Sequence, residues 1–120
     1  MSILQQESVS NILNDIKEIV KKDSNNLIIS TNREKNIKFL KEYSLKKKDV
    51  IQIINKLNIK HFISKVKNKH EDYSHEYLYI FKIDKVLVDT KGLKSIIPIY
   101  LKFNLISPKV ILISIHKAEY

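Results

Sequence analysis

The sequence predicts an α+β protein in which N-terminal helices pack on a C-terminal antiparallel sheet. Up to about residue 58, apolar residues recur at steps of three and four, which is the spacing of amphipathic helices. After residue 60 the chain is rich in Ile, Val, Tyr and Phe, as strands are. Because the chain has 120 residues, we expect one domain, with a helical part over about 1–58 and a sheet part over about 60–120.

The helical part predicts three helices. The first covers residues 3–22, where Ser2 and Gln5 can form a capping box. Residues 27–29 are a short apolar segment and a candidate for extended structure. The second helix covers about 32–42 after a capping-box pattern at residues 31–34, and Ser44 can cap a third. The predicted buried stripes of the first and third helices are Val9, Ile12, Leu13, Ile16, Ile19 and Val20, and Val50, Ile53, Ile54 and Leu57.

The sheet part predicts three strands, at residues 77–88, 95–106 and 109–118. Turn-forming residues at 89–92 separate the first two strands, and Ser107 and Pro108 separate the last two. The polar stretch 60–76 predicts a loop with one edge strand at about 62–66. Together these strands predict an antiparallel meander.

The register of the last hairpin is predicted from its apolar faces, because a slip of one residue turns every side chain to the other face. The predicted pairs are Ile99–Ile115, Leu101–Ile113 and Phe103–Ile111, around a three-residue loop at 106–108. Tyr100 then lies opposite Ser114 and becomes a diagonal neighbour of His116. Lys102 lies further along the same face.

The charge of the chain favours a polyanionic partner, and nucleic acid comes first. The net charge is +9, from 22 basic and 13 acidic residues. Residues 1–44 contribute +1 and residues 45–120 contribute +8, which places the basic surface in the second part. The competing interpretation is that AT-rich codons supply the lysines, because all basic residues except Arg33 are Lys and because Ile and Asn are also abundant.

Several classes of protein are excluded or disfavoured by composition. The chain has no Cys, which excludes disulfides, thiolate metal sites and Cys nucleophiles. A Gly-rich phosphate loop is excluded because Gly92 is the sole glycine. The chain has no long apolar run and its start does not resemble a signal peptide, so we expect a cytoplasmic protein that does not enter a membrane.

Tyr100, Lys102 and His116 on one sheet face are candidate residues for RNA cleavage. The reaction needs a base for the 2′-hydroxyl, a cation for the phosphorane and an acid for the 5′-oxygen, and no metal, because the nucleophile belongs to the substrate. A Tyr in a strand and a His near a C-terminus also occur without any catalytic role.

A metal site is the weaker alternative. The donors His70, Glu71, Asp72 and His75 could bind a metal, but they lie in a predicted loop, for which a solvated surface is the favoured interpretation. We therefore expect neither a metal nor a cofactor.

Four segments, in order and spacing, resemble the MqsR family of toxins. The last strands resemble the family patterns Val-Tyr-Ile/Leu-Lys-Ile and Ser-Phe-His/Lys, and the preceding strand resembles Trp-Val-Phe-Gly-Lys. The similarity covers about residues 30–120. The matching segments are Thr31-Asn-Arg-Glu-Lys-Asn-Ile-Lys-Phe-Leu40, Leu78-Tyr-Ile-Phe-Lys82, Ile99-Tyr-Leu-Lys-Phe103 and Val110-Ile-Leu-Ile-Ser-Ile-His-Lys-Ala-Glu-Tyr120.

This resemblance implies a RelE-like fold and a metal-independent endoribonuclease that cleaves mRNA as the toxin of a type II toxin–antitoxin pair. Its partners would be mRNA and a cognate antitoxin protein, and a homodimer is left open. Tyr100 matches the family's functional tyrosine, Lys102 its strand lysine, and His116 a C-terminal position that holds Lys or His.

Four further residues are expected to bind RNA: Lys65, Tyr79, Lys82 and Lys117. Tyr79 aligns near a position that lines the family's site, and Lys117 follows His116. The chain departs from the family at two places, because Lys65 lies one residue after the usual lysine position and Lys82 replaces a glycine. A non-catalytic RNA- or DNA-binding module and a protein-interaction module on the same fold remain alternatives.

Overall fold

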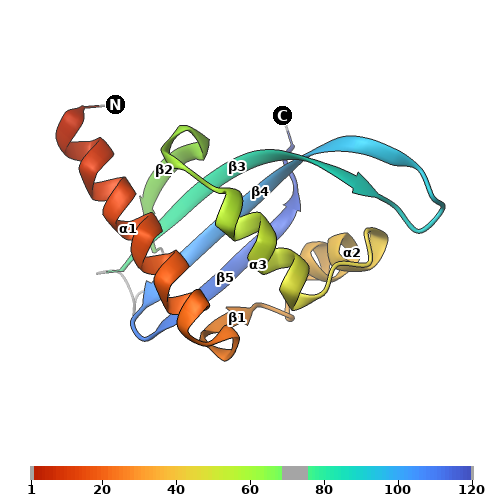
Figure 1. The fold of residues 1–120 in the computed structure, drawn as a ribbon, viewed down its shortest axis with the longest axis horizontal. Coiled ribbons are helices and arrows are strands. Elements are labelled where there is room, and N and C mark those ends of the chain that lie inside the picture. Colours follow the sequence, from red (N-terminus) through yellow and green to blue (C-terminus); the bar gives the residue numbers. More distant parts are fainter. Residues whose placement is uncertain (1, 69–75, 120) are drawn as a thin grey trace.

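The computed structural model describes residues 2–68 and 76–119 and shows the expected α+β fold. Three helices precede most of a five-stranded sheet with the order β1-β5-β4-β3-β2 (Figure 1). The helices are α1 (Ile3–Lys22), α2 (Glu34–Glu42) and α3 (Lys47–Lys56). The strands are β1 (Leu27–Ile29), β2 (Phe62–Lys67), β3 (Tyr77–Val88), β4 (Lys94–Ile106) and β5 (Lys109–Lys117).

The starts of α1 and α3 follow local capping, whereas the capping box predicted at residues 31–34 does not form: α2 begins at Glu34, and its N-cap Arg33 makes no side-chain cap hydrogen bond. The Ser2 hydroxyl accepts a hydrogen bond from the amide of Gln5, so α1 begins as predicted. The prediction that Ser44 caps α3 is wrong, because Ser44 has a φ of 50° and lies in the turn before the helix. The carboxylate of Asp49 accepts from the amide of Lys46 instead, and it places a negative charge in the first turn, beside the lysines.

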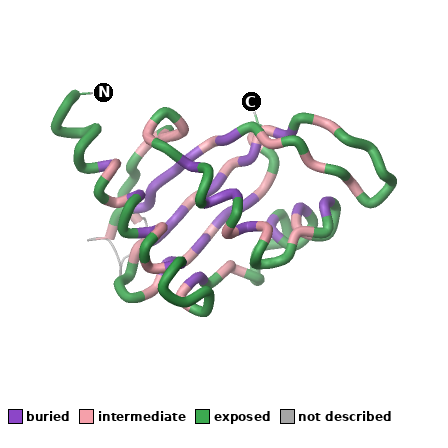
Figure 2. The backbone as a smooth tube through the Cα atoms, in the orientation of Figure 1, coloured by how far each residue is buried: buried purple, intermediate pink, exposed green. Residues whose placement is uncertain are grey.

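The core lies between the sheet and the helices that cross it. In Figure 1, α1 and α3 lie across the front of the sheet, and α2 lies at the side where β1 and β5 meet. Figure 2 shows that the central strands are buried beneath the helices. The predicted stripes are largely confirmed, since Ile16, Ile54 and Leu57 are fully buried and Ile12 is half-buried. Ile99, Leu101 and Phe103, which are predicted on the apolar face of β4, are fully buried, and Ile97 is buried on the same face.

The sheet contains one strand pairing that the predicted antiparallel meander does not include. Residues 27–29 do form a strand, and β1 pairs in parallel with residues 110–112 of β5. The predicted edge strand also exists, as β2, and it extends to Lys67. Within the described residues, no helix is long and apolar enough to cross a membrane.

The β4–β5 register differs from the prediction by two residues near the end of β5 and by one near the turn. Ile106 pairs with Lys109, so the turn has two residues instead of three. The observed pairs are Ile99–Lys117, Leu101–Ile115 and Phe103–Leu112, not those predicted.

A β-bulge causes this difference. The partner of Lys102 is Ser114 and the partner of Phe103 is Leu112, so Ile113 is the extra residue. The bulge changes which residues face the core. The prediction that Ile111 and Ile113 are core residues is therefore wrong, and both are half-buried. Val110 and Leu112 are fully buried in their place.

Candidate functional site

A cleft of about 560 Å³ lies where α2 meets β4 and β5. Its sheet side carries all three predicted catalytic residues, and its other side comes from the start of α2. The complete lining is Arg33, Glu34, Lys35, Asn36, Tyr100, Lys102, Ser114, His116 and Glu119.

Strand pairing brings the three predicted residues together more closely than expected. Tyr100 pairs directly with His116, and Lys102 pairs with Ser114. The rings of Tyr100 and His116 are stacked, with their centroids 4.9 Å apart and an angle of 13° between their planes. The expectation that Tyr100 faces Ser114 is therefore wrong. The shared face is confirmed because a register error of two residues leaves each side chain on its own face.

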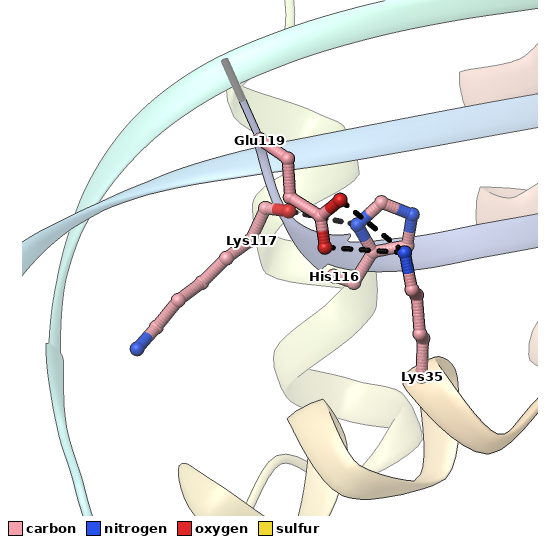
Figure 3. A network of polar contacts seen from close by, with 4 residues as sticks. All are labelled: Lys35, His116, Lys117 and Glu119. Atoms are coloured by element: carbon pink, nitrogen blue, oxygen red, sulfur yellow. Dashed lines mark hydrogen bonds and ion pairs between the residues drawn. The ribbon is translucent and has the colours of Figure 1, made fainter.

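A hydrogen bond defines the tautomer of neutral His116. Its Nδ1 lies 2.8 Å from the carbonyl oxygen of Lys117 (Figure 3). A carbonyl oxygen can only accept, so Nδ1 donates the proton. In the neutral ring the lone pair is then on Nε2, which makes Nε2 the atom that can accept a proton from a substrate.

Asn36 holds α2 against the bulged part of β5. Its side chain is fully buried and its amide nitrogen donates to the carbonyls of Ser30 (3.0 Å) and Ile113 (2.9 Å). Its amide oxygen accepts from the backbone N–H of Ile115 at 2.9 Å. Asn36 thus makes the backbone bonds that a longer β1 would make, and it sets the position of the strand that carries His116.

The α2 side of the cleft supplies two cationic residues, Arg33 and Lys35, with the carboxylate of Glu34 between them in sequence, and none of the three is predicted from the sequence as a site residue. Arg33 and Lys35 both line the cleft, although they belong to the nearly neutral part of the chain. Their one sequence signal is the capping-box pattern at residues 31–34, which predicts a helix start but no ligand. Lys35 contacts Glu119, with 3.1 Å between Nζ and Oε1 (Figure 3).

The four residues expected to bind RNA occupy different places. Lys82 pairs with Tyr100, so its backbone is adjacent to the cleft on β3. Tyr79 pairs with Phe103 and belongs to the buried core, where desolvation raises the pKa of its hydroxyl. Lys65 pairs with Tyr79 at the sheet edge. Neither Tyr79 nor Lys65 lines the cleft.

Lys117 also points away from the cleft, although it follows His116 in the chain. Its ammonium lies 5.6 Å from the ring centroid of Tyr43 and 3.6 Å from a carboxylate oxygen of Glu42. The hydrogen bond with Tyr43 raises the pKa of Lys117. These contacts belong to the side of the sheet that faces the helices.

The sequence candidates for a metal site, His70, Glu71, Asp72 and His75, lie outside the described residues. Within residues 2–68 and 76–119, no three or more His, Asp or Glu side chains gather as a metal site would require.

Comparisons with models of known protein families, with curated proteins and with solved structures find no match for this chain.

Proposed function

We propose that this chain is a metal-independent endoribonuclease that cleaves mRNA and acts as the toxin of a type II toxin–antitoxin pair. The observation that carries the proposal is the cleft in which Tyr100 stacks on His116 beside Lys102. The same three positions match functional positions of the MqsR family in the resemblance described above. The two lines of support are independent, because the cleft depends on strand pairing and the resemblance on sequence order.

The proposed reaction begins when Nε2 of His116 takes the proton of a 2′-hydroxyl. The 2′-oxygen attacks the adjacent phosphorus, and the bond from phosphorus to the 5′-oxygen breaks. Lys102 stabilises the charge that develops on the phosphorane. The leaving 5′-oxygen takes a proton from the Tyr100 hydroxyl or from water, the proton held by His116 restores that donor, and the products are a 2′,3′-cyclic phosphate and a 5′-hydroxyl. Because the nucleophile is part of the RNA, this scheme needs no metal-bound water.

The roles of the partners follow from charge and from the family resemblance. Residues 45–120 carry a net charge of +8, which suits binding to RNA phosphates. The resemblance adds a cognate antitoxin protein that blocks the toxin in the cytoplasm.

The test is expression of the wild type and of His116→Gln, with His61→Gln as the matched control. His61 does not line the cleft, and its Nδ1 accepts from the amide of Asn58. We expect wild type and His61→Gln to arrest growth and cut transcripts, and His116→Gln to lose about 10²–10⁴ in cleavage rate. A small neighbouring reading frame that encodes the antitoxin should relieve the arrest.

Purified protein provides the second part of the test. Cleavage should persist in EDTA and leave a 2′,3′-cyclic phosphate end. Tyr100→Phe should slow cleavage if the hydroxyl, and not water, protonates the 5′-oxygen. Binding of RNA without any cleavage would refute the proposal and favour a non-catalytic RNA- or DNA-binding module. Full activity of His116→Gln would refute the assignment of the base.

A further inference from the structure

On the α2 side of the cleft, Lys35 already binds an anion of the protein itself, the side chain of Glu119. The carboxylate of Glu119 lies with its two oxygens 3.1 and 3.3 Å from Nζ of Lys35 (Figure 3). Glu119, Lys35 and Arg33 all line the cleft that contains His116. A carboxylate in this position resembles a phosphate in charge and in its oxygen atoms.

This contact is weak enough to be exchanged for another anion. The side chains of Lys35 and Glu119 are 63% and 72% exposed. Exposed ion pairs contribute little to stability, because water screens the charges and both side chains lose freedom. A phosphate that makes the same contact with Lys35, and a second contact with Arg33, would therefore displace Glu119.

The cleft has cationic side chains on both of its sides, and such side chains bind the phosphates of nucleic acids. Lys102 and His116 lie on the sheet side, and Arg33 and Lys35 lie on the α2 side. Asn36, which is hydrogen-bonded to β5, keeps the α2 side at a constant distance from the strand. An RNA strand whose scissile phosphate lies at the sheet side would thus bring a flanking phosphate to α2.

We propose, building on the proposed function, that Arg33 and Lys35 form a subsite for an RNA phosphate next to the scissile one. Glu119 occupies this subsite when RNA is absent and competes with the substrate.

The test measures binding separately from cleavage. The probe is a fluorescein-labelled 12-nucleotide RNA with 2′-O-methyl groups throughout, which lacks the nucleophile and stays intact. Anisotropy gives Kd at several salt concentrations for wild type, Lys35→Ala and Glu119→Gln. The matched controls are Lys41→Ala, in the last turn of α2, and Glu18→Gln, on α1; neither lines the cleft.

Lys35→Ala should weaken binding and lower the slope of log Kd against log salt by about 0.7, as expected for one lost phosphate contact on a single strand. Lys41→Ala should leave the slope unchanged. Glu119→Gln should tighten binding roughly two- to five-fold, the range of a lost exposed ion pair. This gain should disappear in Lys35→Ala/Glu119→Gln, because the competition acts through Lys35.

The outcomes separate the subsite from the proposed function. If Glu119→Gln tightens binding equally with and without Lys35, or if Lys35→Ala and Lys41→Ala behave alike, the subsite is refuted. Absence of any binding by the wild type refutes it as well. If the expected binding changes occur but unmodified RNA is never cut, the subsite stands and the nuclease proposal fails.

Discussion

Replacing Asn36 with Ala should both destabilise the protein and disturb the cleft. The side chain of Asn36 is fully buried, and it makes three hydrogen bonds to the backbone of the chain around β1 and β5. Alanine removes all three bonds without offering another partner.

The expected loss follows from the groups that would be left behind. The amide of Ile115 lies in a buried position, and an orphaned buried donor costs about 1–3 kcal/mol. The bonds to Ser30 and Ile113 are part-buried, and such bonds contribute about 0.5–1.5 kcal/mol each. Because these effects are not additive, we expect Asn36→Ala to lower the free energy of unfolding by about 2–5 kcal/mol.

Urea denaturation followed by circular dichroism measures this loss, and Asn55→Ala, at an exposed position of α3, is the control. Cleavage by Asn36→Ala should also fall at temperatures where it remains folded, because the strand that carries His116 loses its support. A loss of stability below about 0.5 kcal/mol would mean that water replaces the Asn36 contacts, and it would refute this account of the bulge.

Three further predictions address the core, the electrostatics and the pH dependence. Leu101 is fully buried in the middle of β4, so Leu101→Ala should cost about 2–5 kcal/mol in urea denaturation, and a cost under about half a kcal/mol would contradict the packing. RNA affinity should fall about tenfold or more between about 50 and 200 mM salt if three or more phosphates are neutralised, and a salt-independent Kd would contradict phosphate binding. Burial, with a smaller effect of Lys60, lowers the pKa of His61 below 6.5, so protonation favours the unfolded chain. Stability should therefore fall as the pH drops below about 6.5, and His61→Gln should reduce this dependence in unfolding measured from pH 7 to pH 5; an unchanged dependence would contradict the assignment.

Helix stripes and strand composition were sufficient for the class of fold. The first stripe predicts α1 with its observed bounds, because each apolar residue at the right step removes surface from water on one side of the helix. The shared face of Tyr100, Lys102 and His116 was also predictable, since alternation along a strand depends on sequence alone. The shared face is predicted correctly although the register is wrong, because the register error near these residues is two positions, and a shift of two positions keeps each side chain on the same face.

The tertiary structure alone decided the bulge, the parallel β1 and the α2 side of the cleft. Residues 110–113 are Val, Ile, Leu and Ile, so both faces of this segment are apolar and alternation cannot select a register. Asn36 looks like an ordinary polar residue in a helix, and its three partners are known only after β5 has docked. Arg33 and Lys35 meet His116 across about 80 residues of sequence, a distance that leaves no local pattern. Side-chain periodicity thus determined which way each residue faces, whereas long-range hydrogen bonds determined what it faces.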